Sequence, residues 1–241
     1  MEQFSELLRL GIVNTYYPLD GTAAIIGTVA VIIAGYILGS LNFALIISKI
    51  FFKDDIREHG SGNAGMTNMQ RTFGNKAAVV TLFGDAAKTA LATFVGAIIL
   101  GSNLFPRVNE ASEYVETIGF AGMYLGGMAA VIGHCFPVFY GFKGGKGVVC
   151  AATMILCTDP IAFLILFAIF AIIVLGTKFI SLGSVMGMLI YPLILSRFHG
   201  KGIHIIFALV VVIIIVAKHH ANIKRLRKGE ENKLELFKKK I

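Results

Sequence analysis

Residues 21–50 read GTAAIIGTVAVIIAGYILGSLNFALIISKI, a tract that carries no charged side chain before Lys49. A helix needs about 20 consecutive apolar residues to cross the hydrocarbon core of a bilayer. Other apolar tracts occupy residues 77–101, 118–139, 147–158, 160–176, 183–196 and 203–217. The sequence therefore predicts an all-α integral membrane protein with seven transmembrane helices, some of them short or broken.

The composition supports a membrane protein along the whole chain. Of the 241 residues, 56% are apolar and only 15% are charged, and the mean hydropathy is +0.78. Soluble domains are usually about 45–50% apolar and about a quarter charged. A net charge of +8 would suggest nucleic-acid binding in a soluble protein, but in a membrane protein it indicates basic cytoplasmic loops. We therefore exclude a soluble fold and expect no nucleic-acid partner.

The stretch 147–176 could form one long helix or two short ones. Asp159 and Pro160 lie in its middle. Proline disrupts a helix interior, and an aspartate facing lipid is costly. We therefore expect two short helices that are separated at these residues.

The distribution of basic residues predicts how the chain is oriented in the membrane. With seven spans, one side carries 16 Lys and Arg residues, on segments 51–76, 140–147, 177–182 and 218–241. The other side carries four, on segments 1–20, 102–117 and 197–202. The positive-inside rule then places the N-terminus outside and the C-terminus in the cytoplasm. We expect an extracytoplasmic extension at 1–20, a seven-span catalytic domain at 21–217 and a basic cytoplasmic tail at 218–241.

The first glycine loop (residues 60–68) reads GSGNAGMTN, and Arg71 follows it. Glycine allows successive backbone N–H groups to converge on an anion. Ser61, Thr67 and Asn68 can add donors, and a guanidinium can hold a phosphate through two parallel hydrogen bonds. A flexible polar turn between spans is the alternative. The density of donors favours phosphate binding.

The second glycine loop (residues 140–147) reads YGFKGGKG. It is not a P-loop, because Lys146 is followed by glycine and no strand precedes the loop. Its glycines and two lysines still suit an anion, as does the helix expected to begin at Val148. A basic turn that only sets topology is the alternative. The nearby His134 lies on an apolar stretch, where a lone histidine is more often a packing residue than a catalyst.

Three further groups of polar residues are weaker signals. Ser181 and Ser184 stand where serines commonly cap a helix. His219 and Asn222 follow the last apolar tract, where a basic interface anchor is an alternative. Asp85 and Lys88 lie one turn apart inside an apolar tract, so they are either functional or mutually paired. The cysteines Cys135, Cys150 and Cys157 form no CxxC pair and predict neither a disulfide nor a metal site.

Four segments closely resemble the bacterial acyl-phosphate:glycerol-3-phosphate acyltransferases. They are GSGNAGMTNMQRTFG, GHCFPVFYGFKGGKGV, SLGS and HHANIKRL, in this order. The resemblance implies a seven-span enzyme of the cell (inner) membrane, with its active site facing the cytoplasm. Such an enzyme transfers a fatty acyl group from acyl phosphate to the 1-hydroxyl of glycerol 3-phosphate, at the first step of phospholipid synthesis. The products are lysophosphatidic acid and phosphate, no cofactor is needed, and a separate phosphate acyltransferase supplies the acyl phosphate.

The resemblance also implies roles for individual residues. The expected catalytic residues are Ser61, Arg71, His134, Lys146, His219 and Asn222. The expected phosphate-binding residues are Gly60, Gly62, Asn63, Gly65, Thr67, Asn68, Lys143, Gly144, Gly145, Ser181 and Ser184. The sequence departs from the family beside His219, where Lys218, His220 and Ala221 provide no acidic partner.

The group that accepts the proton of the acceptor hydroxyl stays open between the substrate phosphate, His134 and His219. We favour the substrate phosphate, because neither histidine has an evident orienting carboxylate in the sequence. Two other classes of protein are weighed against an enzyme. A transporter would need polar clusters on both sides and an inverted repeat, and neither is found. A scaffold would not need two cationic glycine loops.

Overall fold

The computed structural model describes residues 11–12, 21–101, 113–199 and 202–234. The predicted extension at 1–20, apart from residues 11 and 12, lies outside the described residues. So do segment 102–112 and the end of the tail, 235–241. Within the described ranges the regular structure is entirely helical, which confirms the predicted fold class. The chain divides into two compact units, Met1–Thr158 and Asp159–Ile241, and each is described by itself.

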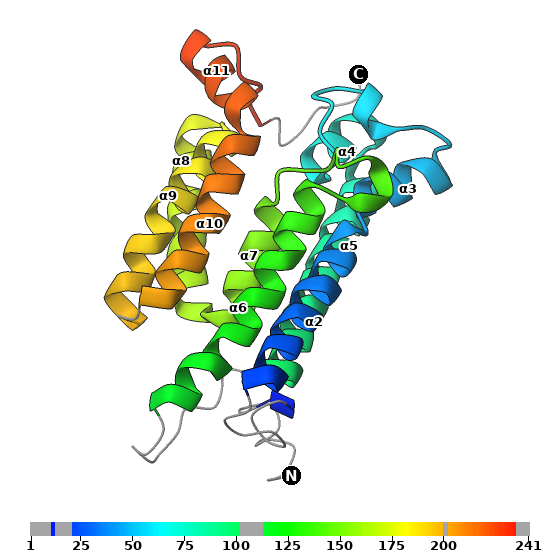
Figure 1. Cartoon of the computed structure of the whole chain (residues 1–241). Coiled ribbons are helices and arrows are strands. Elements are labelled where there is room, and N and C mark those ends of the chain that lie inside the picture. Colours follow the sequence, from blue (N-terminus) through cyan, green and yellow to red (C-terminus); the bar gives the residue numbers. More distant parts are fainter. Residues whose placement is uncertain (1–10, 13–20, 102–112, 200–201, 235–241) are drawn as a thin grey trace. The chain divides into compact units, whose positions relative to one another are not determined.

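Three long helices form the framework of the first unit. They are α2 (Gly21–Ser40), α5 (Asn75–Leu100) and α6 (Glu113–Cys135). Figure 1 shows them side by side, and each contacts the other two. The shorter helices are α3 (Phe43–Phe51), α4 (Met66–Phe73) and α7 (Val148–Thr158). Helices α3 and α4 both pack on α5, while α7 packs on α5 and α6.

Small residues allow α2 and α6 to approach closely. A side chain at Gly39 would overlap the backbone of Ala130, and one at Gly35 would overlap the backbone of Gly126. Because lipid is as apolar as leucine, membrane helices associate through close packing of this kind. The two helices therefore form a rigid base for the loops that follow them.

The tract 21–50 is broken, where we expected one apolar stretch. Helix α2 ends at Ser40, and α3 begins at Phe43 with Asn42 as its N-cap residue. The Asn42 side chain accepts a hydrogen bond of 3.1 Å from the Leu45 N–H group. This cap starts a new helix and stabilises the break.

The described residues of the second unit form four helices. They are α8 (Pro160–Thr177), α9 (Ile180–His199), α10 (Gly202–Lys218) and α11 (His220–Lys228). Helix α9 contacts the other three (Figure 1). The predicted break at 159–160 is confirmed, because α7 ends at Thr158 and Pro160 begins α8. The Asp159 carboxylate caps α8 by accepting a hydrogen bond of 2.9 Å from the Ala162 N–H group.

Among the described residues, five helical segments are long and apolar enough to cross a membrane, and a sixth counts if His204–Lys218 and His220–Lys228, bent by 56°, form one span. Helix α7 has only 11 residues. Helix α8 exposes five large apolar side chains, as a lipid-facing helix does; they are Ile161, Leu164, Phe167, Ile172 and Leu175. Helices thus cover all seven predicted tracts, while the number of spans and their orientation stay predictions.

Candidate active site

Asn68 organises the first glycine loop. Its side-chain oxygen accepts a hydrogen bond of 3.0 Å from the Ser61 N–H group. Its amide nitrogen donates to the carbonyl oxygens of Ile56 and His59, at 3.1 and 2.9 Å. Asn68 is buried, so its polar atoms serve the loop itself. Gly60 has a φ of 56°, in the left-handed region that favours glycine.

A short helix, α4, begins at Met66 within the first loop, which the sequence did not predict. Gly65 precedes α4 without a side-chain cap, so the first N–H groups of the helix have no capping side chain. Ser61 and Arg71 are exposed, while Thr67 and Asn63 are half-buried. The loop and helix therefore present hydroxyl, amide and guanidinium groups on one segment.

The second glycine loop is folded against His134. The Gly145 N–H group donates a hydrogen bond of 3.1 Å to the His134 carbonyl oxygen. A side chain at Gly144 would overlap that carbonyl, and one at Gly145 would overlap Nε2 of the imidazole. Only glycine allows the loop to lie this close. Lys143 is exposed and Lys146 is half-buried, so two basic side chains flank the glycine pair.

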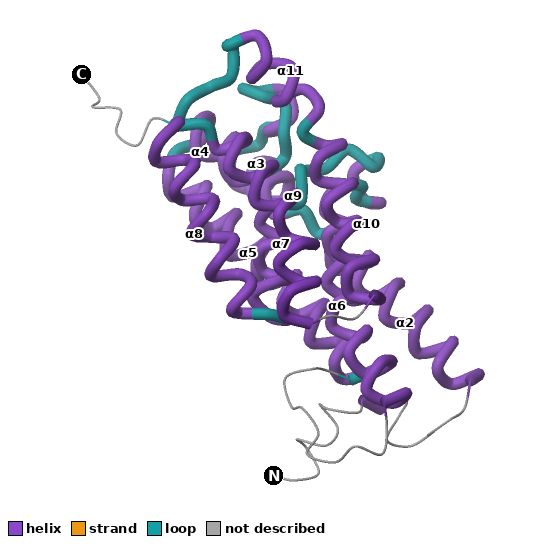
Figure 2. The backbone as a smooth tube through the Cα atoms, turned by 90° about the vertical axis from the view of Figure 1, so that its left-hand side faces the viewer, coloured by secondary structure: helices purple, strands orange, loops and turns teal. Residues whose placement is uncertain are grey.

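Arg57 lies three residues before the first glycine loop and binds the second. Its Nη1 atom donates to the carbonyl oxygens of Tyr140 and Lys143, at 3.0 and 3.3 Å. Asp55 holds the same guanidinium by two hydrogen bonds, of 3.0 and 2.7 Å. These bonds from Arg57 keep the pKa of Asp55 well below its usual range. Figure 2 shows loop segments close to α3 and α4, at the end of the unit where these contacts form.

A second contact joins the loops beneath this ion pair. The side-chain amide of Asn42, at the break between α2 and α3, donates to the carbonyl oxygen of Ala64 at 3.3 Å. A side chain at Gly145 would lie 2.6 Å from the same oxygen. The backbones of the first and second loops therefore meet at Ala64 and Gly145. The sequence did not predict these roles of Arg57, Asp55 and Asn42. The one available signal was the close spacing of Asp55 and Arg57, which permits an ion pair.

A carboxylate and an ammonium group lie beside His134, contrary to our expectation from the sequence. Its Nδ1 atom lies 3.4 Å from Oδ1 of Asp85 and 3.1 Å from Nζ of Lys88. Asp85 and Lys88 themselves form an ion pair of 2.7 Å. His134 is only 4% exposed, and both partners are buried as well. The sequence could not show this arrangement, because the histidine is separated from the ion pair by more than 40 residues.

Two of the four predicted residues of the second unit meet at a carboxylate that the sequence did not single out. Oε1 of Glu231 accepts hydrogen bonds from Ser181 Oγ at 2.8 Å and from Asn222 Nδ2 at 2.6 Å. Oε2 accepts a bond of 2.8 Å from Arg225. Burial opposes ionisation of Glu231, but the bonds from Asn222, Arg225 and Ser181 outweigh it and lower the pKa. Glu231 is thus an acidic partner of Asn222, whereas the partner that the sequence lacked was one beside His219.

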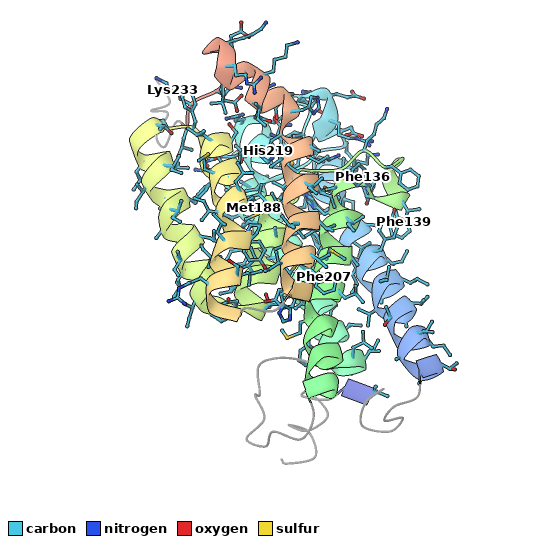
Figure 3. All side chains as sticks on the ribbon, turned by 60° about the vertical axis from the view of Figure 1, so that its left-hand side comes forward. Phe136, Phe139, Met188, Phe207, His219 and Lys233 are labelled. Atoms are coloured by element: carbon cyan, nitrogen blue, oxygen red, sulfur yellow. The ribbon has the colours of Figure 1, made fainter. Side chains whose placement is uncertain are left out.

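The remaining two predicted residues of this unit lie in helical positions. His219 is buried where α10 meets α11 (Figure 3), and its Nδ1 lies 2.8 Å from the Ile215 carbonyl oxygen. The Ser184 hydroxyl donates to the Ile180 carbonyl oxygen of its own helix at 2.9 Å. The tail then folds back, because the Leu234 N–H group donates to the Lys178 carbonyl oxygen at 2.7 Å.

The segment between α6 and the second loop is rich in exposed aromatic side chains. Figure 3 shows Phe136 and Phe139 on this segment, with Phe139 turned away from the helices. Phe142 is exposed as well. Aromatic rings favour the interface between lipid and water. In the described parts of the chain, no group of His, Cys, Asp and Glu could hold a metal ion.

Fold and site together define a helical membrane protein whose two cationic glycine loops are joined and suit anionic ligands. Residues 29–229 match the family model described as glycerol-3-phosphate acyltransferase. A relative from Bacillus anthracis, "Glycerol-3-phosphate acyltransferase 2", is 38% identical over 84% of this chain and 97% of its own length. A relative from Chlorobaculum tepidum is also 38% identical, over 87% of this chain and 97% of its own.

Solved structures agree with these relatives. The crystal structure of PlsY (YgiH), "an integral membrane glycerol 3-phosphate acyltransferase", in its glycerol 3-phosphate form is 30% identical, with a TM-score of 0.74. The structural alignment covers 86% of this chain and 96% of the PlsY chain. The chain therefore belongs to the glycerol-3-phosphate acyltransferase family. It is an integral membrane acyltransferase, which confirms the predicted class of enzyme.

Proposed function

We propose that this enzyme transfers a fatty acyl group from acyl phosphate to the 1-hydroxyl of glycerol 3-phosphate, releasing lysophosphatidic acid and phosphate. The observation that carries this proposal is the junction of two cationic glycine loops within one unit. Both substrates carry a phosphate, and each loop offers glycine backbone and basic side chains to an anion. The solved relative in its glycerol 3-phosphate form supports the choice of acceptor.

The reaction requires no covalent intermediate on the enzyme, because phosphate is a good leaving group. The acceptor hydroxyl oxygen attacks the acyl carbon, the bond from that carbon to the phosphate oxygen breaks, and phosphate leaves with the electron pair. Arg71, Lys143 and Lys146 would hold the two phosphates. Fixing both reactants and stabilising the developing oxyanion can supply much of the rate enhancement.

The phosphate of the acceptor is our proposed base for the hydroxyl proton. Nδ1 of His134 lies against Lys88 and Asp85, and the ring is almost fully buried. Nδ1 of His219 lies against a backbone carbonyl, and that ring is 2% exposed. Both histidines are thus buried, so we propose a phosphate oxygen of the substrate as the acceptor of the proton.

We also propose that both loops face the cytoplasm of the inner cell membrane, where glycerol 3-phosphate is dissolved. The acyl donor and the lipid product would enter and leave through the bilayer. A separate phosphate acyltransferase would supply the acyl phosphate, since nothing in these loops is suited to making it.

The proposal is tested with purified protein, palmitoyl phosphate and glycerol 3-phosphate, by following phosphate release and the lipid product. We expect turnover with palmitoyl phosphate and none with palmitoyl-CoA or acyl carrier protein. Turnover with palmitoyl-CoA alone would contradict the proposed donor.

Arg71→Ala and Lys146→Ala should each lower the turnover number by about 100-fold or more, the loss typical of a removed charge-stabilising donor. Size-exclusion chromatography and thermal unfolding in detergent check that each variant is folded. Full activity in both folded variants would contradict the assignment of the loops to the reaction.

A further inference from the structure

Asp85 and Lys88 provide partners for the backbone at the break in tract 21–50. The Lys88 ammonium donates to the Leu41 carbonyl oxygen at 2.8 Å. Oδ1 of Asp85 accepts from the Phe43 N–H group at 3.4 Å. Inside a bilayer, a backbone group released from a helix needs an internal partner. The ion pair therefore stabilises the break from which Asn42 reaches the first glycine loop.

Lys88 also determines which nitrogen of His134 carries the proton. An ammonium group has three donors and no acceptor. One N–H group of Lys88 points to Leu41, one to Asp85, and the third to Nδ1 of His134. Nδ1 can accept this third bond only when it carries no proton, and in a neutral ring the proton then lies on Nε2.

The charges of the cluster favour a neutral ring. The negative Asp85 and the positive Lys88 balance each other, and a positively charged His134 would have to share the one Asp85 carboxylate with Lys88 in a medium of low dielectric constant. The remaining titratable group here is the Cys150 thiol, a weak donor whose sulfur lies 3.9 Å from the Asp85 carbonyl oxygen. The Cys150 side chain also interacts with the His134 ring, so it belongs to the same cluster.

The protonated nitrogen faces the junction of the two loops. A side chain at Gly145 would overlap Nε2 and would lie 2.6 Å from the carbonyl oxygen of Ala64. The Gly145 N–H group is bonded to the backbone of His134 itself. The imidazole therefore packs against Gly145 at the point where the second loop contacts the first.

We propose that Asp85 and Lys88 are positioning residues, which hold His134 as its Nε2–H tautomer and so fix the glycine loops for acyl transfer. None of the three side chains needs to contact substrate. The effect of this positioning on catalysis rests on the proposed function. The tautomer of His134 does not depend on that function. The tautomer can therefore be measured whatever the reaction proves to be.

The first experiment is nuclear magnetic resonance of the full-length protein with ¹⁵N-labelled histidine rings, with His134 assigned from its missing signals in His134→Gln. We expect an unprotonated Nδ1 and a protonated Nε2 at neutral pH. In Lys88→Met, which leaves Nδ1 without its donor, we expect a change of tautomer or a mixture. A proton on Nδ1 in the wild type would overturn the proposal.

The second experiment separates positioning from simple stabilisation. The double variant Asp85→Leu/Lys88→Met removes both charges, and replacing a buried ion pair by apolar residues is often neutral for stability. We expect a folded protein whose KM for glycerol 3-phosphate rises at least tenfold. If the double variant is folded and its kinetic constants are unchanged, the positioning role is wrong. If it does not fold, His134→Gln decides, because glutamine keeps an N–H group near the Nε2 position and should retain more activity than His134→Phe.

Lys76→Met is the matched control, because Lys76 is an exposed lysine on the same helix. It should change neither the histidine signals nor the kinetic constants. If the wild-type protein shows no activity with any acyl phosphate, the proposed function is contradicted. The histidine signals would still test the tautomer on their own.

Discussion

Gly145 is a residue at which the space around the backbone, and not the backbone conformation, requires glycine. Its φ is not in the left-handed region, so alanine would be allowed by the dihedral angles. The methyl group would, however, overlap the imidazole of His134 and the carbonyl oxygen of Ala64. Because the first of these belongs to a buried ring and the second to a backbone, neither can move cheaply.

We therefore predict that Gly145→Ala lowers kcat/KM by at least about 100-fold, the loss typical of displaced catalytic geometry. The measurement is phosphate release from palmitoyl phosphate at several concentrations of glycerol 3-phosphate. Gly176→Ala is the control, because nothing lies within 4 Å of a side chain there, and alanine is a better helix former than glycine. Equal kinetics for the two variants would contradict the close approach.

Glu231 gives a prediction about pH. The pKa of this carboxyl group is lowered in the folded protein, so its stabilising effect is complete above the ordinary pKa of 4.5. The effect is lost as the pH falls below that value and through the lowered pKa. Glu231→Gln should thus lower the unfolding temperature near neutral pH, because the hydrogen bonds from Ser181, Asn222 and Arg225 lose the charge of their acceptor.

The measurement is thermal unfolding of both proteins in detergent over a series of pH values. The difference in unfolding temperature should shrink as the pH falls below 4.5. A difference that is independent of pH would contradict a role for the ionised carboxylate.

At the scale of the elements, Arg57 connects the loop after α3 with the loop after α6. Its guanidinium uses separate nitrogen atoms for the two carbonyl oxygens and for Asp55. A lysine at this position keeps the charge but cannot reproduce this planar set of donors.

We predict that Arg57→Lys raises the KM for glycerol 3-phosphate by about tenfold, which corresponds to about 1.4 kcal/mol. Steady-state kinetics on the purified variant give this value. Lys76→Met again serves as a control for loss of a basic residue on this unit. An unchanged KM would show that the loops keep their relation without Arg57.

The helices were predictable where neighbouring residues in the sequence determine them. Apolar length located all seven tracts, and Pro160 marked the break before α8. The break at Asn42 was not predictable, because its stability depends on Asp85 and Lys88 more than 40 residues away. Glu231 was missed for the same reason, since Ser181 is 50 residues from it in the sequence. The glycine loops were found because their composition has few other uses in a membrane protein.

At the scale of the whole molecule, the orientation of the chain is the prediction with the widest consequences. Sixteen basic residues on one side against four on the other predict an external N-terminus and a cytoplasmic tail. The test uses single cysteines in a variant from which the three native cysteines have been removed.

We expect Glu110→Cys to react with a membrane-impermeant maleimide in intact cells. Lys228→Cys should react only after the inner membrane is made permeable. Both positions lie in polar segments, so differences in labelling report sidedness. The reverse pattern would contradict the orientation and with it the cytoplasmic site.

The close contact of α2 and α6 also bears on how the gene can change over evolutionary time. At Gly35 and Gly39, any added atom meets a neighbouring backbone, so these codons should accept almost no replacement. On α8, residues such as Leu164 and Ile172 are exposed and need only remain apolar, so many substitutions should be tolerated there. Random mutagenesis with selection for growth should therefore recover a dense set of survivors on α8 and a near-empty strip along one side of α2.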